Sequence, residues 1–181
     1  LEVKLHNWQS YYGGGIDSTD FSFRGKSGKK NAIIYGQNTK GKTAFWEGIL
    51  FALYGEVPKR KAKMRSKKTK LIVAETSHKE PMMNVDHYHE KNSAFTVGVD
   101  LQFDLGGDEY DLSRGYNPRR GVKLPRKNGD MEQYLTLRNM STNEFIKDPD
   151  KFIQTRILAK ELSQFFMFDG ERLNEYKDLL T

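Results

Sequence analysis

The chain has 181 residues, of which 36% are hydrophobic and 30% charged, and its formal net charge is +6. This length and composition predict one globular domain or lobe with a single core. There is no cysteine, which excludes disulfides and cysteine-ligated zinc, and no apolar run near the roughly 20 residues of a membrane span, so we expect a cytoplasmic protein without a membrane anchor.

The start of the chain predicts a β-hairpin. Residues 3–8 alternate in the manner of a strand, the glycine run 13–15 forces a turn, and Phe21 and Phe23 alternate again. Two alternating stretches joined by a glycine turn are typical of paired antiparallel strands.

A strand, a loop and a helix follow in that order. The apolar run 32–35 predicts a short buried strand, and GQNTKGKT occupies residues 36–43. Over residues 44–54, apolar side chains recur every three or four positions, which predicts a helix that Gly55 and Pro58 close. We expect the free amides at the start of this helix to face the loop.

GQNTKGKT fits the pattern of a phosphate-binding loop, which requires Gly, four free positions, and then Gly, Lys and Ser or Thr. Gly36 and Gly41 allow backbone amides to turn inward, Lys42 places a cation on the β and γ phosphates, and Thr43 offers a hydroxyl to Mg2+. The sequence therefore predicts binding of a nucleoside triphosphate with Mg2+. The alternative is a polar turn between two buried elements.

The positive charge is concentrated in one segment. Eight cations with no acid among them fall within twelve residues: Lys59, Arg60, Lys61, Lys63, Arg65, Lys67, Lys68 and Lys70. The rest of the chain has 22 basic and 24 acidic residues. A local excess of this kind indicates a contact with a polyanion, so these residues are candidate DNA contacts; the alternative is a solvated loop. The stretch 59–94 has few apolar anchors and predicts a basic insertion or flexible loop.

Within that stretch, DHYHE contains ligand types that suit a transition metal. His87 and His89 alternate, with Asp86 before them and Glu90 after them. Two alternating histidines leave such a site incomplete, so we prefer an exposed loop.

The strongest strand pattern lies further on. Residues 95–103 alternate without a fault, the glycines at 106–107 turn the chain, and Tyr110 and Leu112 continue the alternation. This predicts a second hairpin with one buried face. A further turn at 119–127 is decorated by cations that we expect to be solvated.

The last part of the sequence, residues 141–181, contains several helix signals. Ser141 with Glu144 predicts a capping box, and the pair 148–149, Asp followed by Pro, predicts a helix start. FFMF at 165–168 predicts a short buried strand. Residues 172–181 predict the start of another helix, which the end of the sequence cuts off. Together with a first residue other than Met, this suggests part of a longer protein. Three aromatic residues are assigned to core packing in preference to base stacking: Tyr11, Phe165 and Phe166.

Hydrolysis by a protein with a phosphate-binding loop also requires a second strand that carries an Asp for Mg2+ and a Glu that orients water. The nearest stretch is LIVAE at 71–75, which lacks the Asp. An NKxD element, which GTPases use to recognise guanine, is also missing from the sequence. We therefore expect the catalytic parts to come from polypeptide outside these residues.

Taken in order, LHNWQSYYG, AIIYGQNTKGKT, the pair FTVGVDLQFD and EYDLSR, and FFMFDGE resemble the N-terminal lobe of the ABC-type ATPase heads of SMC-like proteins. FFMFDGE is most similar to the DndD family, the ATPases of bacterial DNA phosphorothioate (sulfur) modification. The resemblance implies an α/β fold, a P-loop NTPase lobe with a mixed sheet, antiparallel hairpins and a P-loop helix. It implies a head lobe over 1–171, and over 172–181 the start of a helix that leads to a coiled coil.

In this family, the C-terminal lobe of the same protein supplies the signature motif and the Walker B strand that binds Mg2+ and activates water. The resemblance therefore implies an ATP hydrolase that is inactive as this chain alone, and two heads that dimerise on ATP binding. The implied partners are DNA and a sulfur-transfer protein; the alternative is a double-strand-break repair ATPase that works with a nuclease. A non-hydrolysing nucleic-acid-binding module is a further alternative.

The resemblance also implies site residues. Those around the nucleotide are Ser10, Gly36, Asn38, Thr39, Lys40, Gly41, Lys42, Thr43 and Ala44. Thr43 and Asp169 would hold Mg2+, and Lys42 and Asp169 would act in catalysis. Asp169 stands at the position where the family has the Gln of the Gln-loop, and its alternative role is a helix cap. Gln9 stands where an Arg often follows the first strand, and Thr39 where Gly is common.

Overall fold

The computed structural model of the chain describes residues 1–12, 19–23, 33–35, 41–56, 83–89, 95–125 and 128–166. These residues belong to two compact units, Leu1–Ile146 and Lys147–Thr181. The first unit contains a sheet and the helix that follows the GQNTKGKT motif, and the second contains short helical segments.

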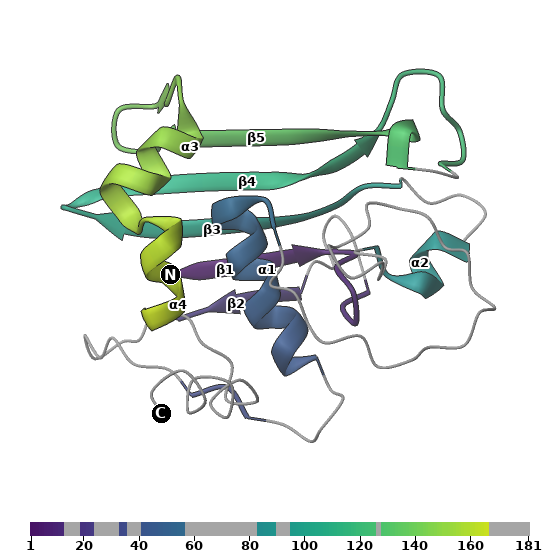
Figure 1. Cartoon of the computed structure of the whole chain (residues 1–181), viewed down its shortest axis with the longest axis horizontal. Helices are drawn as coiled ribbons and strands as arrows, with labels where there is room; N and C mark the ends of the chain where they lie inside the picture. Colours follow the sequence, from purple (N-terminus) through teal and green to yellow (C-terminus); the bar gives the residue numbers. More distant parts are fainter. Residues whose placement is uncertain are drawn as a thin grey trace. The chain divides into compact units, whose positions relative to one another are not determined.

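The first unit is built on an antiparallel sheet with the strand order β2-β1-β3-β4-β5-β6 (Figure 1). The strands are β1 (Glu2–His6), β2 (Thr19–Ser22), β3 (Val97–Leu105), β4 (Asp108–Pro118), β5 (Met131–Asn139) and β6 (Glu144–Phe145). Every described pairing is antiparallel, so the mixed sheet predicted for the family is not seen in the described residues.

Both predicted hairpins are confirmed. Strand β1 pairs with β2, and Val3 lies opposite Phe21. All of β3 pairs with β4, from Val97 opposite Tyr116 down to a two-residue turn at Gly106 and Gly107. These glycines have φ of 67° and 95°, and this left-handed conformation is the one that a tight two-residue hairpin turn requires.

The predicted helix is also confirmed as α1 (Lys42–Tyr54), which ends at Gly55 in the left-handed conformation with φ 71°. The helix lies across the face of the sheet formed by β1, β3 and β4 (Figure 1). Alternate strand residues point toward it, and these form the core with the helix: Val3, Leu5, Val97, Val99, Leu101 and Leu112 from the strands, and Phe45, Leu50, Phe51 and Leu53 from α1.

The buried strand predicted at 32–35 is wrong for the three of those residues that the structure describes. Ile33 and Tyr35 are 90% and 91% exposed, and 33–35 has no strand structure. An apolar run becomes a buried strand only when other strands flank it. The described part of the sheet offers this run no neighbour.

The described part of the predicted loop at 59–94, residues 83–89, is attached to the rest of the first unit. Met83 forms a bridge with Trp8, and Val85–His89 forms the short helix α2. His87 is only 8% exposed, so an exposed loop is the wrong prediction for this residue. The described residues contain no cluster of His, Asp and Glu that suits a metal. Residues 57–82 and 90–94, with all eight candidate DNA contacts, lie outside the described residues.

Strand β5 and the turn after it were not predicted. The capping box at Ser141 and Glu144 is wrong, since 140–143 form a turn and Glu144 enters β6. Asn139 organises this turn instead, because its Oδ1 accepts hydrogen bonds from the backbone N–H groups of Ser141 and Thr142 at 2.9 and 3.1 Å.

In the second unit, the predicted helix start is confirmed. Helix α3 (Pro149–Phe152) begins after Asp148, whose side chain accepts a hydrogen bond from the backbone of Lys151 at 3.1 Å. A π-helical turn, η3 (Ile153–Ile157), and helix α4 (Lys160–Phe166) follow. The strand predicted at FFMF is therefore wrong where it is described, and Phe166 is 71% exposed instead of packed. Short aromatic runs fit both kinds of structure, so their periodicity does not decide between them.

The sheet face away from α1 is polar. The register places Lys4 between Asp20 and Asp100, and Ser113 on the other side of Asp100. His6 Nε2 lies 2.6 Å from Asp100 Oδ2, and the Ser113 hydroxyl donates to Asp100 Oδ1 at 2.6 Å. The hydrogen bond to Asp100 raises the pKa of His6, against the effect of burial. Burial raises the pKa of Asp100, but the hydrogen bonds from His6 and Ser113 outweigh it, and its pKa is lowered.

We predict that this pair makes stability depend on pH. The raised His6 pKa stabilises the fold below the ordinary value of 6.5 and loses this effect as pH rises through the folded value, while the Asp100 contribution is lost as pH falls below 3.8. His6→Gln should therefore lower the free energy of unfolding by about 1 kcal/mol near pH 5.5 and by much less near pH 9. Denaturant unfolding of the wild type and the variant at both pH values measures the difference in free energy of unfolding at each. His89→Gln, at an exposed histidine, is the control; equal differences at the two pH values would contradict the prediction.

Candidate functional site

The end of the GQNTKGKT motif forms the start of helix α1. Gly41 has φ 87° and ψ 0°, and its carbonyl accepts a hydrogen bond from the Phe45 amide at 2.8 Å, the first hydrogen bond of the helix. Lys42, Thr43 and Ala44 therefore lie in the first helical turn, as the motif predicts. Four other predicted nucleotide-binding residues lie outside the described residues: Gly36, Asn38, Thr39 and Lys40.

This helix start suits an anion. The first turn of α1 contains no acidic residue, and among the described residues no side chain caps it. The amides of a helix start carry about half a positive charge, and an acid or a capping side chain would compete with a ligand for them. Phosphate oxygens are the ligands that such a start prefers, especially beside a lysine such as Lys42.

A turn after β1 holds the helix start in place. Within residues 7–11, which we name the Asn7–Tyr11 turn, three side chains reach α1 or Gly41 directly before it. The indole of Trp8 donates to the Ala44 carbonyl at 2.8 Å, the Gln9 amide donates to Glu47 Oε2 at 2.8 Å, and the Tyr11 hydroxyl donates to the Gly41 carbonyl at 3.0 Å. Ser10, predicted to contact nucleotide, is exposed within this turn.

Tyr11 packs beside the motif. Its ring makes an edge contact with Phe21, with centroids 5.7 Å apart, and lies 3.1 Å from where a Cβ at Gly41 would be. Burial raises the pKa of Tyr11, so its hydroxyl keeps its proton to donate. Position 41 is thus restricted to glycine by its left-handed backbone and by the neighbouring ring.

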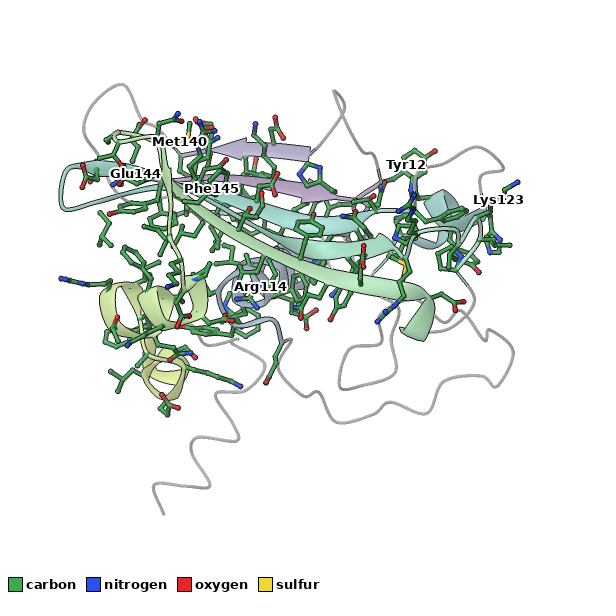
Figure 2. The ribbon with its side chains drawn as sticks, turned by 90° about the horizontal axis from the view of Figure 1, so that it is seen from above. Tyr12, Arg114, Lys123, Met140, Glu144 and Phe145 are labelled. Carbon is green, nitrogen blue, oxygen red and sulfur yellow. The ribbon has the colours of Figure 1, made fainter. Side chains whose placement is uncertain are left out.

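Arg114 on β4 holds the other end of α1. It is buried, and its Nε and Nη2 donate to the carbonyls of Ala52 and Leu53 at 2.9 and 3.3 Å. Figure 2 shows Arg114 beside the helix. A cation here satisfies carbonyls that the last turn leaves free and complements the negative end of the helix dipole. Helix α1 is therefore fixed to the sheet at both ends.

Sequence reasoning missed most of these supports. The burial of Asn84 and Glu47 and the role of Arg114 were not predicted, and Gln9 was considered only as a lost phosphate contact. Arg114 had a signal: it continues the inward alternation of Tyr110 and Leu112, where a cation must have buried partners. Asp169 lies outside the described residues, so its predicted role in Mg2+ binding stays a prediction.

Comparison with known proteins identifies the family of this chain. Residues 2–180 match the sequence model of a family described as an AAA domain. The chain belongs to this AAA domain family. The AAA domain is similar to the DNA double-strand break repair Rad50 ATPase of Thermoplasma acidophilum, with 24% identity over 149 residues. The match covers 82% of this chain and 13% of the relative, so the chain spans only a small part of that protein's length.

The fold of the AAA domain is consistent with a P-loop NTPase, since an antiparallel sheet supports a helix that starts at the phosphate-loop motif. In the part of the chain that the structure describes, no helix has the length and apolar character to cross a membrane.

We predict that Gly41→Ala is more harmful than the same change at a glycine of equal conformation. Gly121 has φ 86°, close to the 87° of Gly41, but no described atom lies within 4 Å of the point that a Cβ at Gly121 would occupy. Both variants bear the left-handed strain of about 1 kcal/mol, and only Gly41→Ala also presses on Tyr11. Thermal unfolding should show the larger loss for Gly41→Ala; equal losses would show that the Tyr11 contact is unimportant.

We also predict that Arg114→Met lowers the free energy of unfolding by about 2 kcal/mol, because it leaves buried helix carbonyls without a donor. Arg119→Met is the control, since Arg119 is exposed and its side-chain Nε donates to the Met131 carbonyl at 3.3 Å. The free energy of unfolding of Arg119→Met should fall by less than about 0.5 kcal/mol, as measured by denaturant unfolding. A similar loss for both variants would argue against a specific role for Arg114.

Proposed function

We propose that this AAA domain is the ATP-binding part of a DNA-associated ATPase head of the SMC/Rad50-like kind, of the type that acts in double-strand-break repair with a nuclease partner. The observation that carries the proposal is the start of α1: the Gly-Lys-Thr end of a complete phosphate-loop motif opens a helix whose first turn has no acid. The family match and the similarity to a repair ATPase support it.

In this proposal, the backbone of residues 36–41 and the first amides of α1 surround the triphosphate of ATP. Lys42 neutralises the β and γ phosphates, and the Thr43 hydroxyl binds Mg2+, which bridges the same phosphates. Asp169 is a second candidate for Mg2+. The chain's own residues thus bind and orient the nucleotide.

Water activation has to come from elsewhere, because the sequence lacks a strand with the Asp and Glu that hydrolysis needs. We propose that a C-terminal lobe of the same protein supplies it. The exposed apolar residues Ile33 and Tyr35 fit this proposal, because they lie directly before the motif and strands of another lobe would cover them.

ATP would then act as a switch between two heads. The γ phosphate and Mg2+ contact both heads only in the closed dimer, so binding favours closure and hydrolysis releases it. The basic residues between Lys59 and Lys70 are the candidate DNA contacts. A role in DNA phosphorothioate modification rests on the FFMFDGE stretch alone, and a sulfur-transfer protein encoded beside this one would favour it over repair.

We predict that Mg-ATP stabilises the 181-residue chain and that Lys42→Ala removes this effect. A ligand at 100 times its Kd adds about 2.7 kcal/mol to the free energy of unfolding, which a thermal shift measures. Lys123→Ala is the control, because Lys123 is an exposed lysine on the β4–β5 connection, labelled in Figure 2. The chain alone should turn ATP over negligibly.

The outcomes separate the alternatives. A wild-type chain that shows no thermal shift at millimolar Mg-ATP would favour the alternative of a nucleic-acid-binding module in which the loop has only a structural role. Robust turnover by the purified chain alone would refute the need for a second lobe. Equal shifts for the wild type and Lys42→Ala would exclude the proposed site.

A further inference from the structure

The Asn7–Tyr11 turn contains two residues in an unfavourable backbone conformation. Asn7 and Gln9 have φ of 50° and 46°, in the left-handed region that residues other than glycine seldom adopt. Such residues persist only where the surroundings hold them. Something must therefore hold the turn that supports the start of α1.

Asn84 contacts both of these residues. Its backbone N–H donates to the Asn7 carbonyl at 2.6 Å, and its side-chain Nδ2 donates to the Gln9 carbonyl at 2.7 Å. Asn84 is 6% exposed, so these bonds are shielded from water. Its Oδ1 accepts from the backbone N–H groups of Asp86 and His87 at 3.0 and 3.1 Å, which ties the contact to α2.

The turn passes this restraint to the motif. Trp8 lies between the two strained residues and donates to the Ala44 carbonyl, Gln9 donates to Glu47, and Tyr11 donates to the Gly41 carbonyl. Ala44 and Gly41 are within the phosphate-loop motif or directly after it. A displaced Gln9 would therefore move three contacts at the start of α1 together.

We propose that Asn84 is a positioning residue of the nucleotide site: its side-chain amide holds the Asn7–Tyr11 turn, and the turn holds the helix start in the geometry that receives phosphate. The nucleotide part of this inference rests on the function proposed above. The mechanical part, from Asn84 to the helix start, stands without it.

Asn84→Asp isolates the contact. The carboxylate keeps an oxygen for Asp86 and His87 and keeps the backbone bond to Asn7, but it replaces the donor to the Gln9 carbonyl with an acceptor. The chain offers a matched control in Asn139→Asp, since Asn139 is also buried and its Oδ1 also accepts two backbone N–H groups. Asn139 precedes Met140, which Figure 2 shows at the opposite end of the sheet from Tyr12.

Two measurements on the folded 181-residue chain decide the inference. The first is hydrogen exchange of the Trp8 indole N–H and the Phe45 amide, which report the turn and the first helical bond. We expect Asn84→Asp to speed both by about tenfold, with no change in Asn139→Asp. The second is the Kd for Mg-ATP below the unfolding temperature, which we expect Asn84→Asp to raise by about tenfold and Asn139→Asp to leave unchanged.

Each result has a definite meaning. Unchanged exchange in Asn84→Asp overturns the inference. Faster exchange with an unchanged Kd overturns the positioning role, since Asn84 then serves stability alone. If the wild-type chain binds no Mg-ATP, the proposed function fails and the nucleotide role of Asn84 fails with it, while the exchange result still decides the mechanical link. If Asn84→Asp does not fold, Asn84→Ser replaces it, because serine keeps an uncharged acceptor but does not reach Gln9.

Discussion

The hydrogen bond from the Trp8 indole to the Ala44 carbonyl is the contact on which the candidate site depends. Trp8 is fully buried, and the centroid of its ring lies 4.9 Å from that of Phe51, which is on α1 like Ala44. One side chain thus fills the core between sheet and helix and also supplies a directed bond to the helix start. A residue with a similar apolar body but no N–H would fill the space without orienting the helix.

The rest of the unit keeps α1 close enough for this bond. A Cβ at Gly48 would lie 2.8 Å from a Leu5 methyl, so the absence of a side chain there allows the helix to approach the sheet. Arg114 fixes the opposite end of the helix, where the carbonyls of Ala52 and Leu53 would otherwise be buried without donors. Packing sets the distance, and hydrogen bonds at the two ends set the direction of α1.

Local patterns account for the parts of the fold that could be predicted. The alternation over 95–103, the glycine turn at 106–107 and the periodicity over 44–54 each follow from neighbouring residues, and all three elements are present. The strand predicted at 32–35 depends on partners distant in sequence, and a short aromatic run such as FFMF fits a helix as well as a strand. Neither is encoded in a short window of sequence.

The candidate site also contains residues that local patterns could predict and residues that they could not. Gly41, Lys42 and Thr43 could be placed from a motif, because each residue type answers to a chemical need of a bound triphosphate. Asn84 could not, because it acts through carbonyls of residues 75 or more positions away, and backbone acceptors leave no pattern in sequence. Strand β5 was missed because its inward positions do not alternate cleanly, with Gln133 exposed between Met131 and Leu135.

The chain contains two tryptophans, Trp8 and Trp46. Trp8 is bonded to the first turn of α1, and Trp46 lies on that helix three residues after Thr43. The tryptophan fluorescence of these 181 residues therefore originates at the helix start. Indole emission responds to the polarity and hydrogen bonding around the ring, so the molecule carries its own optical probe of the region where phosphate is proposed to bind.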